Sequence, residues 1–147
     1  MTKILDISEA TSIAFHGIVL VAISQVAINA NDIAEITNAS KHHTSKVMQR
    51  LVKHGLIGST RGPSGGFYLK KKPEDILLID ILEAIEGKVE LTPCPIDNEI
   101  CPFGSCLMGG ICNEISEKMI NHLKSNTLAD ILKNVSEDFK LDTLTIK

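Results

Sequence analysis

Residues 41–72 read KHHTSKVMQRLVKHGLIGSTRGPSGGFYLKKK and carry eight basic side chains and three histidines, with no Asp or Glu. With neutral histidines this segment has a charge of about +8 and the rest of the chain about −11, which gives the net charge of −3. Charge divided so unequally indicates a surface that binds a polyanion such as DNA, because binding releases counterions. A solvated lysine-rich face is the alternative, and the pattern of the residues has to decide.

The first half of this segment, together with the ten residues before it, predicts a helix-turn-helix. A short helix over Asp32 to Thr37, with Asn31 as its N-cap, is followed by a turn at residues 38–40. Ser40 then caps an amphipathic, basic helix over residues 41–54. In a helix-turn-helix the second helix enters the major groove with its N-terminal side chains on base edges.

The second half predicts a wing. Two β-type runs, residues 56–60 and 67–69, flank the sequence Arg61-Gly-Pro-Ser-Gly-Gly66, whose glycines and proline suit the tip of a hairpin. Arg61 is carried on that tip, where it can reach phosphates or a narrow minor groove. A helix-turn-helix followed by such a hairpin is a winged helix, so charge and pattern together predict DNA binding.

The rest of the chain predicts a mostly α fold, because aliphatic residues are abundant and aromatic residues scarce. A first helix over residues 7–27 is apolar on nearly all sides and should be buried. A fourth helix is expected over residues 73–85, and another from Asn113 to Ser125. Thr127, with Asp130 three residues later, should cap a last short helix.

The chain of 147 residues is expected to form one domain, or one domain with an appended helical unit. No secretory signal opens it, and its longest apolar run, residues 13–30, is interrupted by polar residues. We therefore expect a soluble, cytoplasmic protein that does not enter a membrane. An enzyme is not expected, because no nucleophile–base pair, phosphate-binding loop or carboxylate dyad has a usable spacing.

Four cysteines lie in a Pro- and Gly-rich loop, with the spacing Cys94-x6-Cys101-x4-Cys106-x5-Cys112. In the cytoplasm such cysteines are expected to bind metal or sense redox state. No C-x2-C pair is present, which argues against a zinc site, whereas iron–sulfur clusters accept thiolates from a longer loop. The spacing favours an iron–sulfur cluster, with a thiol or disulfide switch, a zinc site and simple buried cysteines as open alternatives.

The helix-turn-helix, the motif RGPSGGFYL and the cysteine loop followed by NTLADIL together resemble the IscR/NsrR, or Rrf-two, family of bacterial winged-helix regulators. The resemblance runs from Ile7 to Leu132. It implies a winged helix-turn-helix DNA-binding domain (1–88), a cysteine cluster loop (89–112), and a long C-terminal dimerisation helix with a tail (113–147). It also implies a homodimeric repressor that binds a palindromic operator in double-stranded DNA and senses iron, nitric oxide or redox state through an iron–sulfur cluster.

The ligands of the cluster-sensing IscR branch are three cysteines and a histidine three residues after the last of them. Cys94 and Cys106 align with the first and third of these cysteines, and Cys101 approximately with the second. The position of the histidine holds Gly109. The resemblance therefore does not supply a complete ligand set from this branch.

The NsrR branch offers a second alignment, in which Cys101, Cys106 and Cys112 match the cysteine spacing of some members. That branch also takes a carboxylate from the first helix of the other subunit, and here that position is Ser12. Two completions stay open: all four cysteines on one cluster, or three cysteines with His16 of the partner subunit. The second follows from the resemblance to a related redox-sensing member, which offers a first-helix histidine at the matching position. From the residues alone, His16 is expected to be a buried histidine satisfied by a neighbouring backbone group. A 4Fe-4S cluster is slightly favoured over a 2Fe-2S cluster.

For DNA, the resemblance points to the start of the helix over residues 41–54 and to the wing. The candidate contacts to bases, phosphates or the minor groove are Ser40, Lys41, His42, His43, Ser45, Lys46, Arg50, Arg61 and Ser64. The exposed histidines could equally be solvated. The alternative function is a winged-helix regulator that senses redox state through thiols without metal, or one that zinc stabilises.

Overall fold

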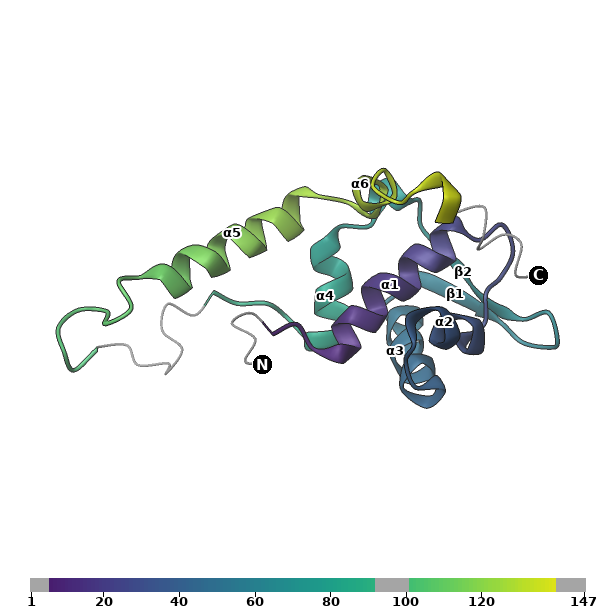
Figure 1. The fold of residues 1–147 in the computed structure, drawn as a ribbon, viewed down its shortest axis with the longest axis horizontal. Helices are drawn as coiled ribbons and strands as arrows, with labels where there is room; N and C mark the ends of the chain where they lie inside the picture. The colour runs from purple at the N-terminus through teal and green to yellow at the C-terminus, as the bar shows by residue number, and fades with distance from the viewer. Residues whose placement is uncertain (1–5, 92–100, 140–147) are drawn as a thin grey trace.

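The structure is a computed structural model that describes residues 6–91 and 101–139 (Figure 1). It confirms the mostly α winged helix-turn-helix with one two-stranded hairpin. The elements are α1 (Glu9–Ile23), α2 (Ala30–Thr37), α3 (Lys41–Lys53), β1 (Ile57–Thr60), β2 (Gly66–Leu69), the 3-10 turn η1 (Pro73–Asp75), α4 (Leu78–Glu86), α5 (Ile111–Ser125) and α6 (Leu128–Leu132). Among these helices, none has the length and apolar content needed to span a bilayer.

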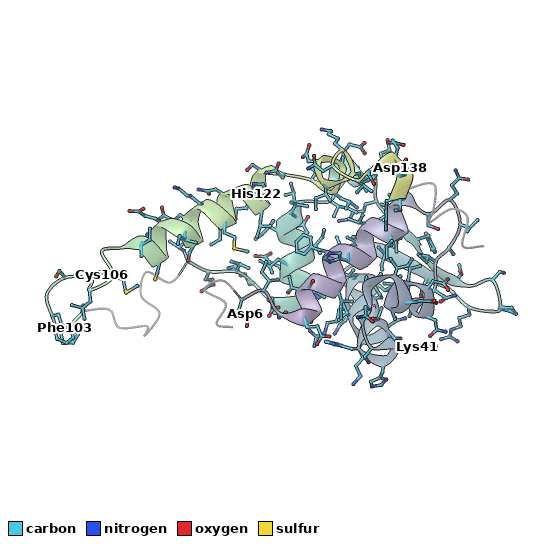
Figure 2. All side chains as sticks on the ribbon, in the orientation of Figure 1. Asp6, Lys41, Phe103, Cys106, His122 and Asp138 are labelled. Atoms are coloured by element: carbon cyan, nitrogen blue, oxygen red, sulfur yellow. The ribbon has the colours of Figure 1, made fainter. Side chains whose placement is uncertain are left out.

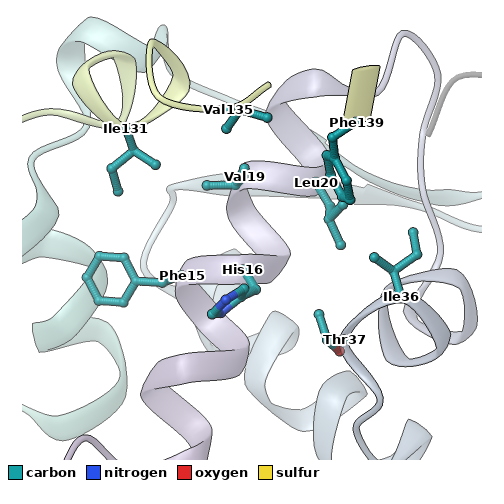
Figure 3. Close-up of a pocket in the computed structure, with 9 residues that line it drawn as sticks. All are labelled: Phe15, His16, Val19, Leu20, Ile36, Thr37, Ile131, Val135 and Phe139. Atoms are coloured by element: carbon teal, nitrogen blue, oxygen red, sulfur yellow. The ribbon is translucent and has the colours of Figure 1, made fainter. Parts of the chain in front are cut away.

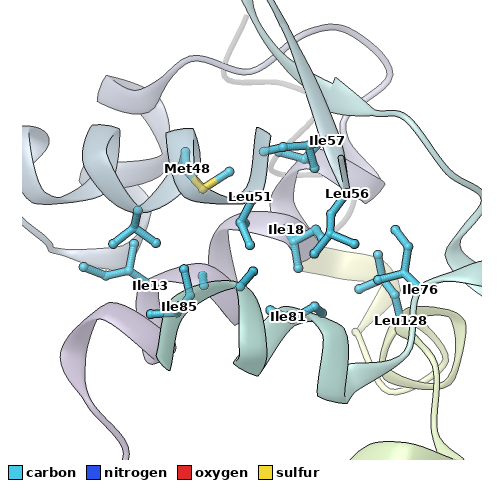
Figure 4. Close-up of a cluster of buried hydrophobic side chains, with 14 of the residues drawn as sticks. Ile13, Ile18, Met48, Leu51, Leu56, Ile57, Ile76, Ile81, Ile85 and Leu128 are labelled. Carbon is cyan, nitrogen blue, oxygen red and sulfur yellow. The ribbon is translucent and has the colours of Figure 1, made fainter. Parts of the chain in front are cut away.

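Helix α1 is the centre of the fold. It packs against α2, α3, α4, β2 and α6, and its residues Ile13 and Ile18 lie in the core shown in Figure 4. Ser8 caps it, as its Oγ accepts a hydrogen bond of 3.0 Å from the backbone N–H of Thr11. The helix ends at Ile23, earlier than the apolar pattern predicted, and its outer side is exposed at His16. Apart from Glu9 and His16, the residues of the helix are buried or half-buried.

The helix-turn-helix consists of α2, a short turn and α3. Helix α2 begins at Ala30, and its N-cap is Asn29, whose Oδ1 accepts a hydrogen bond of 2.9 Å from the N–H of Asp32. The prediction of Asn31 as the cap was wrong, because Asn29 is the last residue with extended backbone and Asn31 already lies inside the helix. Ser40 caps α3 as predicted, and accepts from the N–H of His43 at 3.3 Å.

The wing is tied to the connection between α1 and α2. Strands β1 and β2 pair antiparallel, and Phe67 of β2 exchanges two backbone hydrogen bonds with Ile28, of 2.7 and 3.2 Å. Gly66 passes so close to this connection that a Cβ there would lie 2.6 Å from the carbonyl carbon and oxygen of Ile28. Glycine at position 66 is therefore what allows the wing to dock.

The predicted continuous fourth helix is wrong. Residues 73–75 form the turn η1, and Ile76 and Leu77 then leave the helical conformation before α4 starts at Leu78. These residues pair instead with a distant segment. The N–H of Leu78 donates to the carbonyl of Asn126 at 3.0 Å, and the N–H of Leu128 donates to the carbonyl of Ile76 at 2.8 Å.

This pairing fixes the C-terminal part of the chain. Leu128, at the start of α6, is fully buried in the same core as α1. Helix α5 begins at Ile111, two residues before the predicted start, and extends away from the body (Figure 1). The described part of the cysteine loop lies at its far end. The cysteine segment and the winged helix thus occupy opposite ends of the molecule.

We expect Gly66→Ala to lower the free energy of unfolding by about 1–3 kcal/mol, because the new methyl group would overlap the backbone of Ile28. Urea unfolding followed by circular dichroism measures this. Ser59→Ala, an exposed change on the paired strand, is the matched control. Equal stability of the two variants would contradict the close approach.

The capping box of α6 predicts a pH dependence. Asp130 accepts hydrogen bonds from Lys133 Nζ at 2.8 Å and from the N–H of Thr127 at 2.9 Å, and these partners lower its pKa to about 2. Because the folded-state pKa is lowered, the stabilisation is complete above pH ~4 and is lost as the pH falls towards ~2.

Thermal unfolding between pH 7 and pH 2 tests this. Asp130→Asn should lower the melting temperature at pH 7, and the difference from the wild type should shrink as the pH approaches ~2. Asp138→Asn, at an exposed position, serves as the control. A difference that stays constant with pH would show that Asp130 does not make this contribution.

Candidate nucleic-acid interface and cysteine turns

Helix α3 presents a polar, basic face to solvent. Its buried side, made by Thr44, Val47, Met48 and Leu51, packs into the core. The exposed residues on the helix are Lys41, His42, Lys46, Gln49, Arg50 and Lys53. The buried residues follow one another at intervals of three and four, which places them on one side of the helix and leaves the polar residues on the other. The face has the size and charge of a helix that reads the major groove.

Three of the residues at the start of α3 that were predicted to contact DNA are less available for it than expected. The Oγ of Ser40 is occupied by its cap. His43 and Ser45 are half-buried, and the Nδ1 of His43 lies 3.6 Å from Oε2 of Glu9 at the start of α1. His43 therefore faces α1 as well as solvent, whereas Lys41, His42 and Lys46 are exposed.

The wing places Arg61 beside α3. Arg61 and Ser64 are both exposed on the hairpin tip, as predicted. A groove of about 330 Å³ separates the wing from the helices, and its lining includes Asn29, Gln49, Thr60 and Arg61. Gln49 was not among the predicted contacts, although it lies three residues after Lys46 on the same exposed side. Its donor and acceptor groups are of the kind that read base edges.

Arg50 has a partner inside the protein. Its Nη1 donates a hydrogen bond of 3.1 Å to the carbonyl oxygen of Ile85, in the last turn of α4. Sequence reasoning placed Arg50 on DNA because it is exposed and basic. The sequence could not predict this partner, because the Ile85 carbonyl is a backbone group 35 residues away.

Two of the cysteines begin equal turns. The N–H of Gly104 donates to the carbonyl of Cys101, and the N–H of Gly109 donates to the carbonyl of Cys106, each at 3.0 Å. Both glycines have positive φ, of 75° and 62°, a conformation that glycine adopts readily. The segment is thus a tandem pair of C-x-x-G turns, and the residue that replaces the histidine of the IscR branch is the glycine that closes the second turn.

The three described thiols differ in exposure. Cys106 is exposed and is labelled in Figure 2, whereas Cys101 and Cys112 are half-buried. Cys112 lies in the first turn of α5, where its carbonyl accepts from Ser116 Oγ at 2.8 Å. Cys94, predicted as a fourth ligand, lies outside the described residues.

The donor chemistry and the arrangement of these thiols can be compared with an iron–sulfur site. Cysteine thiolates are the usual ligands of such clusters, so the residue types fit. Within residues 6–91 and 101–139, however, no three His, Cys, Asp or Glu side chains are grouped closely enough to hold a metal ion. A site made by these thiols would need them to be drawn together.

His16, the other candidate ligand, is exposed on α1, so its predicted burial is wrong. Its backbone partner is confirmed, as Nδ1 lies 2.7 Å from the carbonyl oxygen of Ser12. The ring borders a pocket of about 410 Å³ (Figure 3), lined otherwise by Phe15, Val19, Leu20, Ile36, Thr37, Ile131, Val135 and Phe139. Helix α1 lies far from residues 101–110 within one chain (Figure 1).

The sequence model of the Rrf2 family, described as an iron-dependent transcriptional regulator, matches residues 7–134. The Rrf2 protein of Nitratidesulfovibrio vulgaris is 34% identical over 125 residues, which cover 84% of this chain and 79% of that protein. The transcriptional regulator IscR of Photorhabdus laumondii is 31% identical over 104 residues, or 70% of this chain. That match spans 63% of the IscR sequence, slightly less than two thirds of its length.

Solved structures share the fold. CymR, the global cysteine regulator of B. subtilis, superposes with a TM-score of 0.73 at 24% identity, over 90% of this chain and 100% of that one. IscR of T. potens superposes with a TM-score of 0.66 at 25% identity, over 91% of this chain and 90% of that one. The winged helix and the helix that follows it are therefore a shared architecture.

Proposed function

This chain belongs to the Rrf2 family of transcriptional regulators, and from that membership we propose that it acts in the cytoplasm as a homodimeric repressor of operator DNA. One observation carries the proposal: the exposed basic face of α3 lies beside Arg61 of the wing, with a polar groove between them. Helix α3 would enter the major groove, and the wing would reach phosphates or the minor groove.

The proposed contacts follow from exposure. Lys41, His42 and Lys46 present side chains to base edges or phosphates, and Gln49 joins them on the same face. The remaining proposed contacts are of two kinds. Ser40, His43 and Ser45 are half-buried or already have a partner in the protein, and Arg61 and Ser64 lie on the wing. Nine basic or polar groups on two adjacent elements are enough to hold one half-site.

An apolar stripe on α5 supports the homodimer. Ile111, Ile115 and Met119 follow one another at intervals of four residues and are 44%, 37% and 38% exposed. Residues with this spacing lie on one side of a helix. A second copy that covers the stripe would remove it from water and would set the distance between the α3 helices of the two subunits. Two such helices related by twofold symmetry suit a palindromic operator.

The cysteine segment would carry the signal. In this proposal Cys101, Cys106 and Cys112 hold an iron–sulfur cluster, completed by Cys94 or by His16 of the partner subunit. A 4Fe-4S cluster is slightly favoured over a 2Fe-2S cluster. Bound there, the cluster would supply iron that reacts with nitric oxide or oxidants. The turns at Cys101 and Cys106 hold thiols outside the helix, and the family description as iron-dependent supports a metal-based signal.

The alternative is a sensor that uses thiols without iron, or a site that zinc stabilises. The exposure of Cys106 and the ungrouped thiols of the described residues favour the metal-free thiol sensor over a preformed metal site. An exposed thiol is open to oxidation, and a neighbouring cysteine can resolve the product as a disulfide.

The DNA contact can be tested with the salt dependence of binding. Arg61→Ala should weaken binding to duplex DNA and lower the slope of log affinity against log salt by about one unit, because one phosphate contact is lost. Lys118→Ala, an exposed change on α5, should leave the slope unchanged. An unaltered slope for Arg61→Ala would remove the wing from the interface.

The cluster can be tested by anaerobic purification. The protein should be brown and contain iron and sulfide, and Cys106→Ser should lose both, while Ser105→Ala at the adjacent exposed position keeps them. Colourless wild-type protein without iron or sulfide would remove the cluster from the proposal. About one zinc per chain, or reversible disulfides that change DNA affinity, would replace it with the alternative.

A further inference from the structure

The last turn of α4 is a junction between α1 and α3. On one side, Arg50 of α3 donates to the carbonyl of Ile85 at 3.1 Å. On the other, the carboxylate of Glu86 accepts hydrogen bonds from the hydroxyls of Ser8 and Thr11 at the start of α1. Three helices that are distant in sequence are thus joined by polar contacts at one point.

Each contact supplies a partner to polar groups at a helix end that have none within the helix. The carbonyls in the last turn of a helix have no partner within it, and a guanidinium near a helix C-terminus also complements the helix dipole. Ile85 is 8% exposed, so little water is available to replace Arg50. Glu86 lies beside the N-terminus of α1, where a negative charge is favoured.

The electrostatics of the junction agree with this geometry. Hydrogen bonds from Ser8 and then Thr11, together with the charge of Arg50, lower the pKa of Glu86 below its ordinary value. Glu86 is therefore ionised at neutral pH. Arg50 contributes to this shift by its charge alone, while its own hydrogen bond goes to the Ile85 carbonyl.

We infer that Arg50 is a positioning residue that fixes the last turn of α3 against α4, and that it does not neutralise a DNA phosphate. The inference rests on the proposed DNA binding, because it concerns how the reading helix is held. It separates Arg50 from Lys46, which lies one turn earlier on α3: both side chains are exposed, and the hydrogen bond of Arg50 to the Ile85 carbonyl distinguishes them.

The test measures two quantities on each of two variants: the melting temperature, and the salt slope of binding to a mixed-sequence DNA duplex. Arg50→Met should lower the melting temperature by about 2–6 °C, because a hydrogen bond is lost, and should leave the salt slope unchanged. Lys46→Met should do the opposite, with an unchanged melting temperature and a slope lower by about one unit.

A fall of about one unit in the slope for Arg50→Met, with any melting temperature, would overturn the inference. So would an unchanged melting temperature. If Arg50→Met does not fold, Arg50→Gln, which removes the charge and keeps an amide donor, gives the same comparison of slopes. Wild-type protein without salt-dependent DNA binding would contradict the proposed function instead, and the melting temperatures would still test the junction.

Discussion

The burial of α1 is the constraint on which the rest of the fold depends. Helices α2, α3 and α4 and strand β2 all pack against this helix directly. At Gly17 the approach is so close that a Cβ would lie 2.6 Å from the Sδ of Met48, on the inner side of α3. The position of α3, and with it the direction of its basic face, is therefore set by how closely two helices can pack.

Local signals in the sequence predicted most of this fold. The caps Ser8 and Ser40 and the turn glycines act on neighbouring residues, so their effect can be read without a structure. The errors lie where distant segments meet. The break in the fourth helix depends on Thr127, and the role of Arg50 depends on a carbonyl of α4. For the candidate cysteine ligands, the sequence predicted the residue types but no geometry.

The basic segment that first indicated DNA binding is not electrostatically uniform. Lys41 and Lys46 are exposed, whereas His43 lies 3.6 Å from Glu9 and the charge of Arg50 helps to lower the pKa of Glu86. A protein that must hold a positively charged helix together has to offset some of its repulsion. Here Glu9 at the start of α1 and Glu86 at the end of α4 place negative charge beside α3.

The pairing of residues 76–78 with residues 126–128 encloses the whole cysteine loop and α5 in one closed loop of chain. During synthesis, the core of the winged helix lacks Leu128 until that loop has been made. Closing a loop costs conformational entropy that grows with the freedom of the enclosed chain. Any ligand or bond that orders the cysteine turns lowers this entropic cost. It thereby stabilises the winged helix without contacting it.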